Sequence, residues 1–252
     1  MANLFKDIFE SLSKDSDFVR FGRLPVNQNV LGGNVIEILP SVELVESSMA
    51  IAREKSLKTM ASNQNLDSRT LAEKISQSCR GVLGEASVHL LLAKQLGISL
   101  NKIKRFDLER DSFAYTPSEY DLEINESRIE VRTSNNPTPL IHDFLNLPNR
   151  GVICTYTNEL KSFEKSSDFY FAVVYDYPGL RGPLTTANKL SFESDILEKR
   201  LRMYLVAGVN NTEKEKYGVF TQMGQSNTSY QVVPFAKCRN IFEVIEELGS
   251  KC

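Results

Sequence analysis

The sequence has no tryptophan, two histidines and four cysteines in 252 residues. Its cysteines form no C-x-x-C pair, so neither a zinc site nor a disulfide framework is expected, and buried free thiols are the default. These cysteines are Cys79, Cys154, Cys238 and Cys252. No apolar run approaches the roughly 20 residues that a membrane span requires. The composition therefore favours a globular protein without a membrane anchor.

Several catalytic motifs are also missing. There is no G-x-G-x-x-G segment after a strand and no P-loop, so the sequence gives no indication of a dinucleotide or nucleoside triphosphate site. His142 and Asp143 are adjacent, as two members of a hydrolase triad might suggest, but no G-x-S-x-G elbow accompanies them. A surface loop is the preferred interpretation of this dipeptide.

The charge balance permits several kinds of partner. The formal net charge is −2, which argues against a uniformly basic surface but is compatible with a basic cleft beside acidic outer helices. The first residues lack the basic segment and apolar block of a secretory signal, so we expect a cytoplasmic location.

The N-terminal part of the chain has mainly helical periodicity. Apolar residues recur at helical spacing over 3–13 and again over 42–61. Between them, glycines and prolines over 24–40 predict a loop with one short strand at 35–38. The basic residues of the second helix could contact a phosphate backbone, but a solvated helix face is the preferred interpretation; they are Arg53, Lys55 and Lys58. We therefore predict an N-terminal helical region over 1–66 and an α/β domain over 67–252.

The longest predicted helix begins near Thr70 and ends at Gly97. Thr70 and Glu73 have the spacing of a capping box, and glycine readily adopts the left-handed conformation at a helix end. Gly81 and Gly84 lie inside this helix, where each glycine costs about 1 kcal/mol relative to alanine. Two glycines followed by Glu85 predict a helix face pressed against a sheet, with Glu85 delivered to it.

The rest of the chain is rich in short β-type runs, and the fold class predicted is α/β. We expect a mixed central sheet of about five strands flanked by helices. The predicted strands after residue 135 cover 152–156, 169–175, 203–209, 217–222 and 230–233, and a last helix covers 241–248.

A β-hairpin is predicted over 121–132. Leu122 and Ile124 alternate with polar residues, as do Ile129 and Val131, so each pair lies on one face of its strand. With a four-residue turn over 125–128, Leu122 is expected opposite Val131, Asp121 opposite Arg132 and Glu123 opposite Glu130.

The other face of this hairpin carries Asp121, Glu123, Glu130 and Arg132. Opposed carboxylates repel unless a cation lies between them, and Mg²⁺ prefers one or two carboxylates together with water and phosphate. The alternative interpretation is a solvated face with a cross-strand Asp–Arg pair.

In this order of elements the chain resembles the PD-(D/E)xK nuclease superfamily, to which many type II restriction endonucleases belong. The resemblance covers a helix with Glu85, a strand with Asp121 and a next strand with Glu130-Val131-Arg132. It implies a restriction-endonuclease-like fold that cleaves DNA. Asp121 and Glu130 would be ligands of Mg²⁺, for which Mn²⁺ could substitute, with Glu85 as an auxiliary ligand. It also implies double-stranded DNA and a second copy of the chain as partners, in a homodimer.

Arg132 departs from the family pattern, which has lysine at this position. A guanidinium does not take a proton from water, but its forked donors can stabilise charge on a phosphate, and we assign it that catalytic role. Lys161 or Lys165 is an alternative source of the missing lysine. Two other functions stay open: a catalytically degenerate nuclease fold that binds DNA or assembles complexes, and a repair or RNA nuclease of the same fold.

Overall fold

The protein is described by a computed structural model that covers residues 19–25, 31, 34–62, 70–109, 120–157, 166–177, 201–222 and 229–251. The helix predicted over 3–13 lies outside these residues. So do Cys252, Lys161 and Lys165. Cys79, Cys154 and Cys238 are buried free thiols, as predicted.

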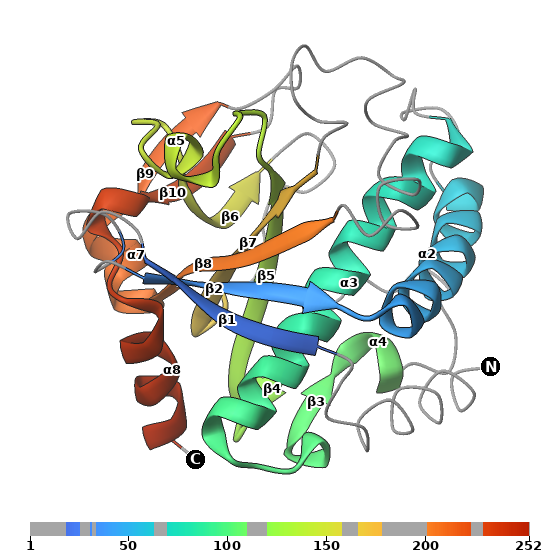
Figure 1. Cartoon of the computed structure of the whole chain (residues 1–252), viewed down its shortest axis with the longest axis horizontal. Helices are drawn as coiled ribbons and strands as arrows, with labels where there is room; N and C mark the ends of the chain where they lie inside the picture. The colour runs from blue at the N-terminus through green and yellow to red at the C-terminus, as the bar shows by residue number, and fades with distance from the viewer. Residues whose placement is uncertain are drawn as a thin grey trace.

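A seven-stranded mixed sheet forms the centre of the molecule, with strand order β1-β2-β8-β7-β5-β4-β3 (Figure 1). β5 and β7 run parallel, and the other neighbours are antiparallel. The strands are β1 (Val19–Pro25), β2 (Asn34–Pro40), β3 (Ile103–Arg105), β4 (Leu122–Ile124), β5 (Ser127–Asn135), β7 (Phe169–Asp176) and β8 (Arg202–Asn210). The predicted α/β class with a mixed sheet is confirmed. The predicted count of about five strands is too low, because β1 and β3 add one strand at each edge of the sheet, whereas β2 matches the short strand predicted at 35–38.

A second, antiparallel sheet has the order β6-β10-β9. It contains β6 (Gly151–Thr157), β9 (Val219–Gln222) and β10 (Ser229–Pro234), with the short helices α5 (Ile141–Leu145), α7 (Asn211–Tyr217) and η4 (Phe235–Lys237) nearby in sequence. Its strands match three of the predicted β runs, and β7 and β8 match the other two.

β7 explains how two cores form on the two faces of the main sheet. All its residues are buried. Phe171 and Val173 belong to the core shared with the long helices, whereas Ala172 and Val174 belong to the core shared with β6 and β10. Alternate side chains of a strand point to opposite faces, so a strand covered on both sides is a continuous apolar run.

The helices of the first core are α2 (Val42–Ser62), α3 (Leu71–Leu96) and α8 (Ile241–Ser250), with η2 (Leu100–Lys102) and α4 (Phe106–Glu109) after α3. α2 and α3 lie side by side (Figure 1). The predicted limits of α3 are confirmed: Thr70 and Glu73 form the capping box, and Gly97 ends the helix with a φ of 62°. No helix in the described ranges combines the length and the hydropathy needed to span a bilayer.

The described part of residues 1–66 shares the main core. β2 pairs with β8, and Ile36, Ile38 and Leu44 contribute side chains to the cluster that α3 and β7 also form. The division of the chain at residue 66 stays a prediction.

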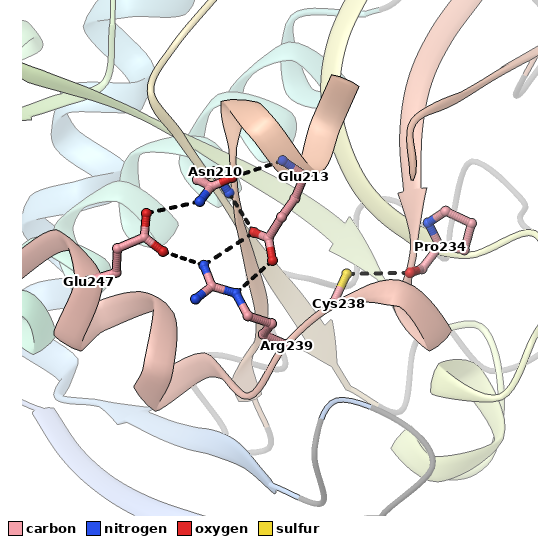
Figure 2. Close-up of polar contacts among 6 residues, drawn as sticks. All are labelled: Asn210, Glu213, Pro234, Cys238, Arg239 and Glu247. Carbon is pink, nitrogen blue, oxygen red and sulfur yellow. Dashed lines mark hydrogen bonds and ion pairs between the residues drawn. The ribbon is translucent and has the colours of Figure 1, made fainter. Parts of the chain in front are cut away.

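An ion-pair cluster of Asn210, Glu213, Arg239 and Glu247, named here the Arg239 cluster, joins α7 and α8 (Figure 2). Arg239 Nε donates to Glu213 Oε1 at 2.6 Å, and its Nη2 donates to Glu247 Oε2. Asn210 caps α7 through the backbone N–H of Glu213. These contacts hold the C-terminal helix to the end of β8.

Candidate active site

Gly84 allows α3 to approach β5 closely. A Cβ atom at this position would lie 2.6 Å from Thr133 Cγ2, which real side chains do not tolerate. At Gly81 the nearest atom to such a Cβ is Glu85 Oε1 at 3.9 Å, an ordinary contact. Of the two glycines that predicted close packing, Gly84 is the one that the packing requires.

Glu85 follows Gly84 and is buried, with 6% of its surface exposed. Its Oε2 lies 3.7 Å from Arg105 Nη2, and the same Nη2 donates to the backbone oxygen of Val82 at 3.0 Å. Burial, together with the charge of Asp121, raises the pKa of Glu85 to about 8. The helix therefore carries a carboxyl group that resists ionisation at neutral pH.

Asp121 lies at the point where β4 begins beside β5. Its N–H donates to the oxygen of Ile129 at 3.1 Å, and its Oδ2 accepts from the N–H of Val131 at 2.7 Å. The carboxylate thus takes the place of a backbone acceptor in the ladder. Burial and the charge of Glu130 raise the pKa of Asp121 to about 7, although the hydrogen bond from Val131 acts in the opposite direction.

The hairpin register differs from the prediction. Leu122 pairs with Ile129 and Glu123 with Arg128, so the turn contains two residues, Asn125 and Glu126, instead of four. These two residues have φ values of 43° and 66°, as a type I′ turn requires. Continued by one residue, this register places Asp121 opposite Glu130, not Arg132.

The predicted burial of the hairpin is nevertheless confirmed. A shift of two residues keeps every side chain on the same face, whereas a shift of one would exchange the faces. The four apolar residues of the hairpin are buried: Leu122, Ile124, Ile129 and Val131.

Arg132 is held by three groups. Its Nη2 lies 3.1 Å from Glu130 Oε1 and donates to the oxygen of Cys154 at 3.3 Å. Its Cζ lies 5.3 Å from the centre of the Tyr156 ring, a cation–π distance. The predicted pair with Asp121 is replaced by the pair with Glu130, although the Arg132 charge still lowers the pKa of Asp121.

Two further basic residues border the acids. Lys55 Nζ, on α2, donates to Asp107 Oδ2 at 2.6 Å, and Arg105 on β3 is 2% exposed. Lys55 was predicted on a solvated face, but only 32% of its side chain is exposed, and no role was predicted for Arg105. The alternation of Ile103, Lys104 and Arg105 is a signal that places Arg105 on the buried face of a strand.

Asp121 interacts electrostatically with both other predicted acids. Its charge contributes to the raised pKa of Glu85, and the charge of Glu130 contributes to the raised pKa of Asp121. Within the described residues, no three His, Cys, Asp or Glu side chains form a group that could hold one ion. A pair of carboxylates with water is sufficient for Mg²⁺. A divalent cation would relieve the repulsion that, after burial, raises the pKa values of Glu85 and Asp121. Asp121 with one neighbouring acid therefore fits such an ion.

Comparisons with known proteins assign no function. No protein-family model matches the chain, and no solved structure matches it. A protein of Methanocaldococcus jannaschii named uncharacterized protein MJECS01 is 24% identical over 263 residues, which cover 92% of this chain and 95% of that protein. The likeness thus extends along nearly the whole of both chains, and it leaves the activity to be argued from the site.

Proposed function

We propose that this protein is a Mg²⁺-dependent endonuclease that hydrolyses phosphodiester bonds in double-stranded DNA, as a type II restriction endonuclease does. The observation that carries the proposal is the position of Asp121, half-buried where β4 meets β5 and electrostatically linked to both Glu85 and Glu130. Strongly perturbed carboxyl groups cluster at functional sites more often than elsewhere. A homodimer, with one active site for each DNA strand, is part of the proposal.

The order of elements supports it. α3 brings Glu85, the start of β4 brings Asp121, and β5 brings Glu130 and Arg132 before the chain continues to the parallel strand β7. This is the helix, hairpin and strand order on which the resemblance to PD-(D/E)xK nucleases depends. The restriction-endonuclease-like fold is therefore proposed together with the activity.

The residues have separable roles in such a reaction. Asp121 and Glu130 would hold the Mg²⁺ ion. Glu85 would be an auxiliary ligand through a coordinated water, because no three acids of the described residues form a group around one ion. When bound, the ion lowers the pKa of a coordinated water and polarises a phosphoryl oxygen. Arg132, fixed by Glu130 and the oxygen of Cys154, would present its charge to the phosphate as negative charge develops there.

The test is cleavage of DNA substrates of varied sequence, with Mg²⁺, with Mn²⁺ and with EDTA. Asp121→Asn and Glu130→Gln should abolish cleavage and leave DNA binding measurable, because each removes one charged ligand and keeps the shape of the side chain. Glu123→Gln is the matched control, since Glu123 lies on the same hairpin but pairs with Lys104 at 2.7 Å. Normal cutting by both ligand variants would place the chemistry elsewhere.

A second candidate function has its own observation. Arg132, which stands where the family has lysine, contacts Glu130, Cys154 and Tyr156. Such contacts within the protein are typical of a structural residue. A nuclease fold that only binds DNA or assembles complexes would have such a residue. In that case the wild type should cut no DNA or RNA with either metal, and Arg132→Ala should lower the stability alone. Cleavage of RNA in preference to DNA would instead indicate the RNA or repair nuclease.

A further inference from the structure

Lys55 lies at the border of the acidic residues, although it belongs to a helix far from them in sequence. Its Nζ donates to Asp107 Oδ2 at 2.6 Å, and its side chain is 32% exposed, whereas that of Asp107 is 5% exposed. Asp107 follows Arg105, which faces Glu85, by two residues. The ammonium group therefore lies at a solvent-accessible margin of the site.

The surroundings of Lys55 keep it charged. Burial acts against the ammonium form, but the carboxyl groups of Glu85, Asp107 and Asp121 outweigh it and raise the pKa of Lys55 above its usual value. A lysine of this kind does not act as a base at neutral pH. It can supply positive charge.

Arg132 and Lys55 differ in the freedom to follow a substrate. The Arg132 guanidinium is held by Glu130, the oxygen of Cys154 and the ring of Tyr156. An ammonium group on a flexible four-carbon stem can reorient its three donors. A phosphate that enters the site adds a second anion near Lys55 and competes with Asp107 for it.

We infer that Lys55 contacts the phosphate that is held beside Asp121, and that α2 thus supplies the ammonium group that the family pattern places at the position of Arg132. The inference rests on the proposed nuclease function. It makes α2 a part of the active site, not only a covering helix.

The experiment compares Lys55→Met with Lys104→Met. Lys104 is a matched control because it also pairs with one carboxylate at 2.7 Å but is 55% exposed and borders Glu123. Single-turnover cleavage should fall about 100-fold in Lys55→Met, the effect of removing one donor to the transition state. Lys104→Met should cut as the wild type does, and Lys55→Arg should retain part of the activity.

A second measurement separates phosphate contact from a structural role. DNA binding is measured against salt concentration with Ca²⁺ as the probe metal. The logarithm of the DNA-binding constant falls linearly with the logarithm of the salt concentration. Loss of one phosphate contact makes this slope less steep by about 0.9. Lys55→Met should show this decrease. The double variant Lys55→Met, Asp107→Asn, which leaves no unpaired carboxylate at 107, should show the same losses and controls for misfolding.

The outcomes distinguish the two proposals. If the wild type cuts and Lys55→Met cuts equally well with an unchanged salt slope, the role of Lys55 is wrong and the nuclease function stands. If the wild type cuts neither DNA nor RNA with Mg²⁺ or Mn²⁺, the nuclease function is wrong and the role of Lys55 fails with it.

Discussion

Two groups of carboxylates in this molecule have opposite electrostatics. In the Arg239 cluster, hydrogen bonds from Asn210 and Arg239 outweigh partial burial and lower the pKa of Glu247 (Figure 2). At the candidate active site, burial and mutual repulsion raise the pKa values of Glu85 and Asp121. The first arrangement stabilises the charged form of Glu247 and joins two helices. The second destabilises the charged form, which a protein tolerates where a cation or substrate is to be bound.

The difference comes first from burial, which is nearly complete at Glu85 and partial at Glu247, and then from the cation beside each group. Arg239 lies between Glu213 and Glu247 and donates to both through its guanidinium. Glu85 has Arg105 at 3.7 Å, too far for a hydrogen bond, and Arg105 Nη2 donates to a backbone oxygen instead. A nearby positive charge therefore does not restore the usual pKa of Glu85.

The largest expected effect concerns the stability of the metal-free protein at high pH. The pKa of Glu85 rises from 4.5 to about 8 in the folded state. Below pH 4.5 both states are protonated and the group contributes nothing. Between pH 4.5 and 8 the unfolded chain loses its proton first, so the free energy of unfolding falls, by about 5 kcal/mol at most.

Glu85→Gln should remove this decrease. In EDTA, urea unfolding at pH 5 and at pH 8 should show the variant more stable than the wild type at pH 8 and nearly equal at pH 5. Glu247→Gln is the comparison, since loss of a favourably placed charge should lower stability near neutral pH. A wild type and a Glu85→Gln variant with parallel pH profiles would contradict the buried, uncharged state of Glu85.

The next effect concerns the contact between α3 and β5. Gly84→Ala should destabilise the protein by about 1–3 kcal/mol, because the new Cβ overlaps Thr133 Cγ2 and the helix must move away. Gly81→Ala, with space for a Cβ, should stabilise it by up to about 1 kcal/mol through its higher helix propensity. Thermal unfolding measures both. Equal effects of the two substitutions would show that α3 does not press on β5 at Gly84.

The third effect is a loss of stability when the Arg239 cluster is broken, similar in size to that of Gly84→Ala. Arg239→Ala should cost about 1–2 kcal/mol, since it removes hydrogen bonds to two charged groups that are partly exposed. Chemical unfolding measures the loss. DNA cleavage, where observed, should stay at the wild-type level because no predicted ligand is involved. A loss of cleavage without a loss of stability would connect this cluster to the active site.

Local chemistry explains which features the sequence could predict. The ends of α3 were predictable because Thr70, Glu73 and Gly97 act on the backbone beside them. α7 was missed because its sequence has no apolar stripe, although Asn210 and Glu213 have the spacing of a capping box. β1 was missed too, since its short run offers little alternation.

The candidate site was predictable only where it depends on local sequence patterns. Glu85, Asp121 and Glu130 follow from a helix with glycines and an alternating hairpin, which are local patterns. The approach of Lys55 and Arg105 depends on how α2 and β3 pack against α3, and spacing in sequence carries little information about that. The roles of all these residues stay predictions that the cleavage assays decide.

The smallest effect tests the hairpin register that places Asp121 opposite Glu130. Two-residue and four-residue turns bury the same apolar side chains, so burial alone does not choose between them. In the observed turn Glu126 has a φ of 66°, which costs a residue with a Cβ roughly 1 kcal/mol or more. Glu126→Gly should relieve this strain and raise the free energy of unfolding by up to about 1 kcal/mol, offset in part by the greater flexibility of the unfolded chain. Glu246→Gly, in the exposed middle of α8, is the control and should destabilise by a similar amount. Destabilisation by Glu126→Gly would contradict the two-residue turn, and with it the pairing of Asp121 with Glu130.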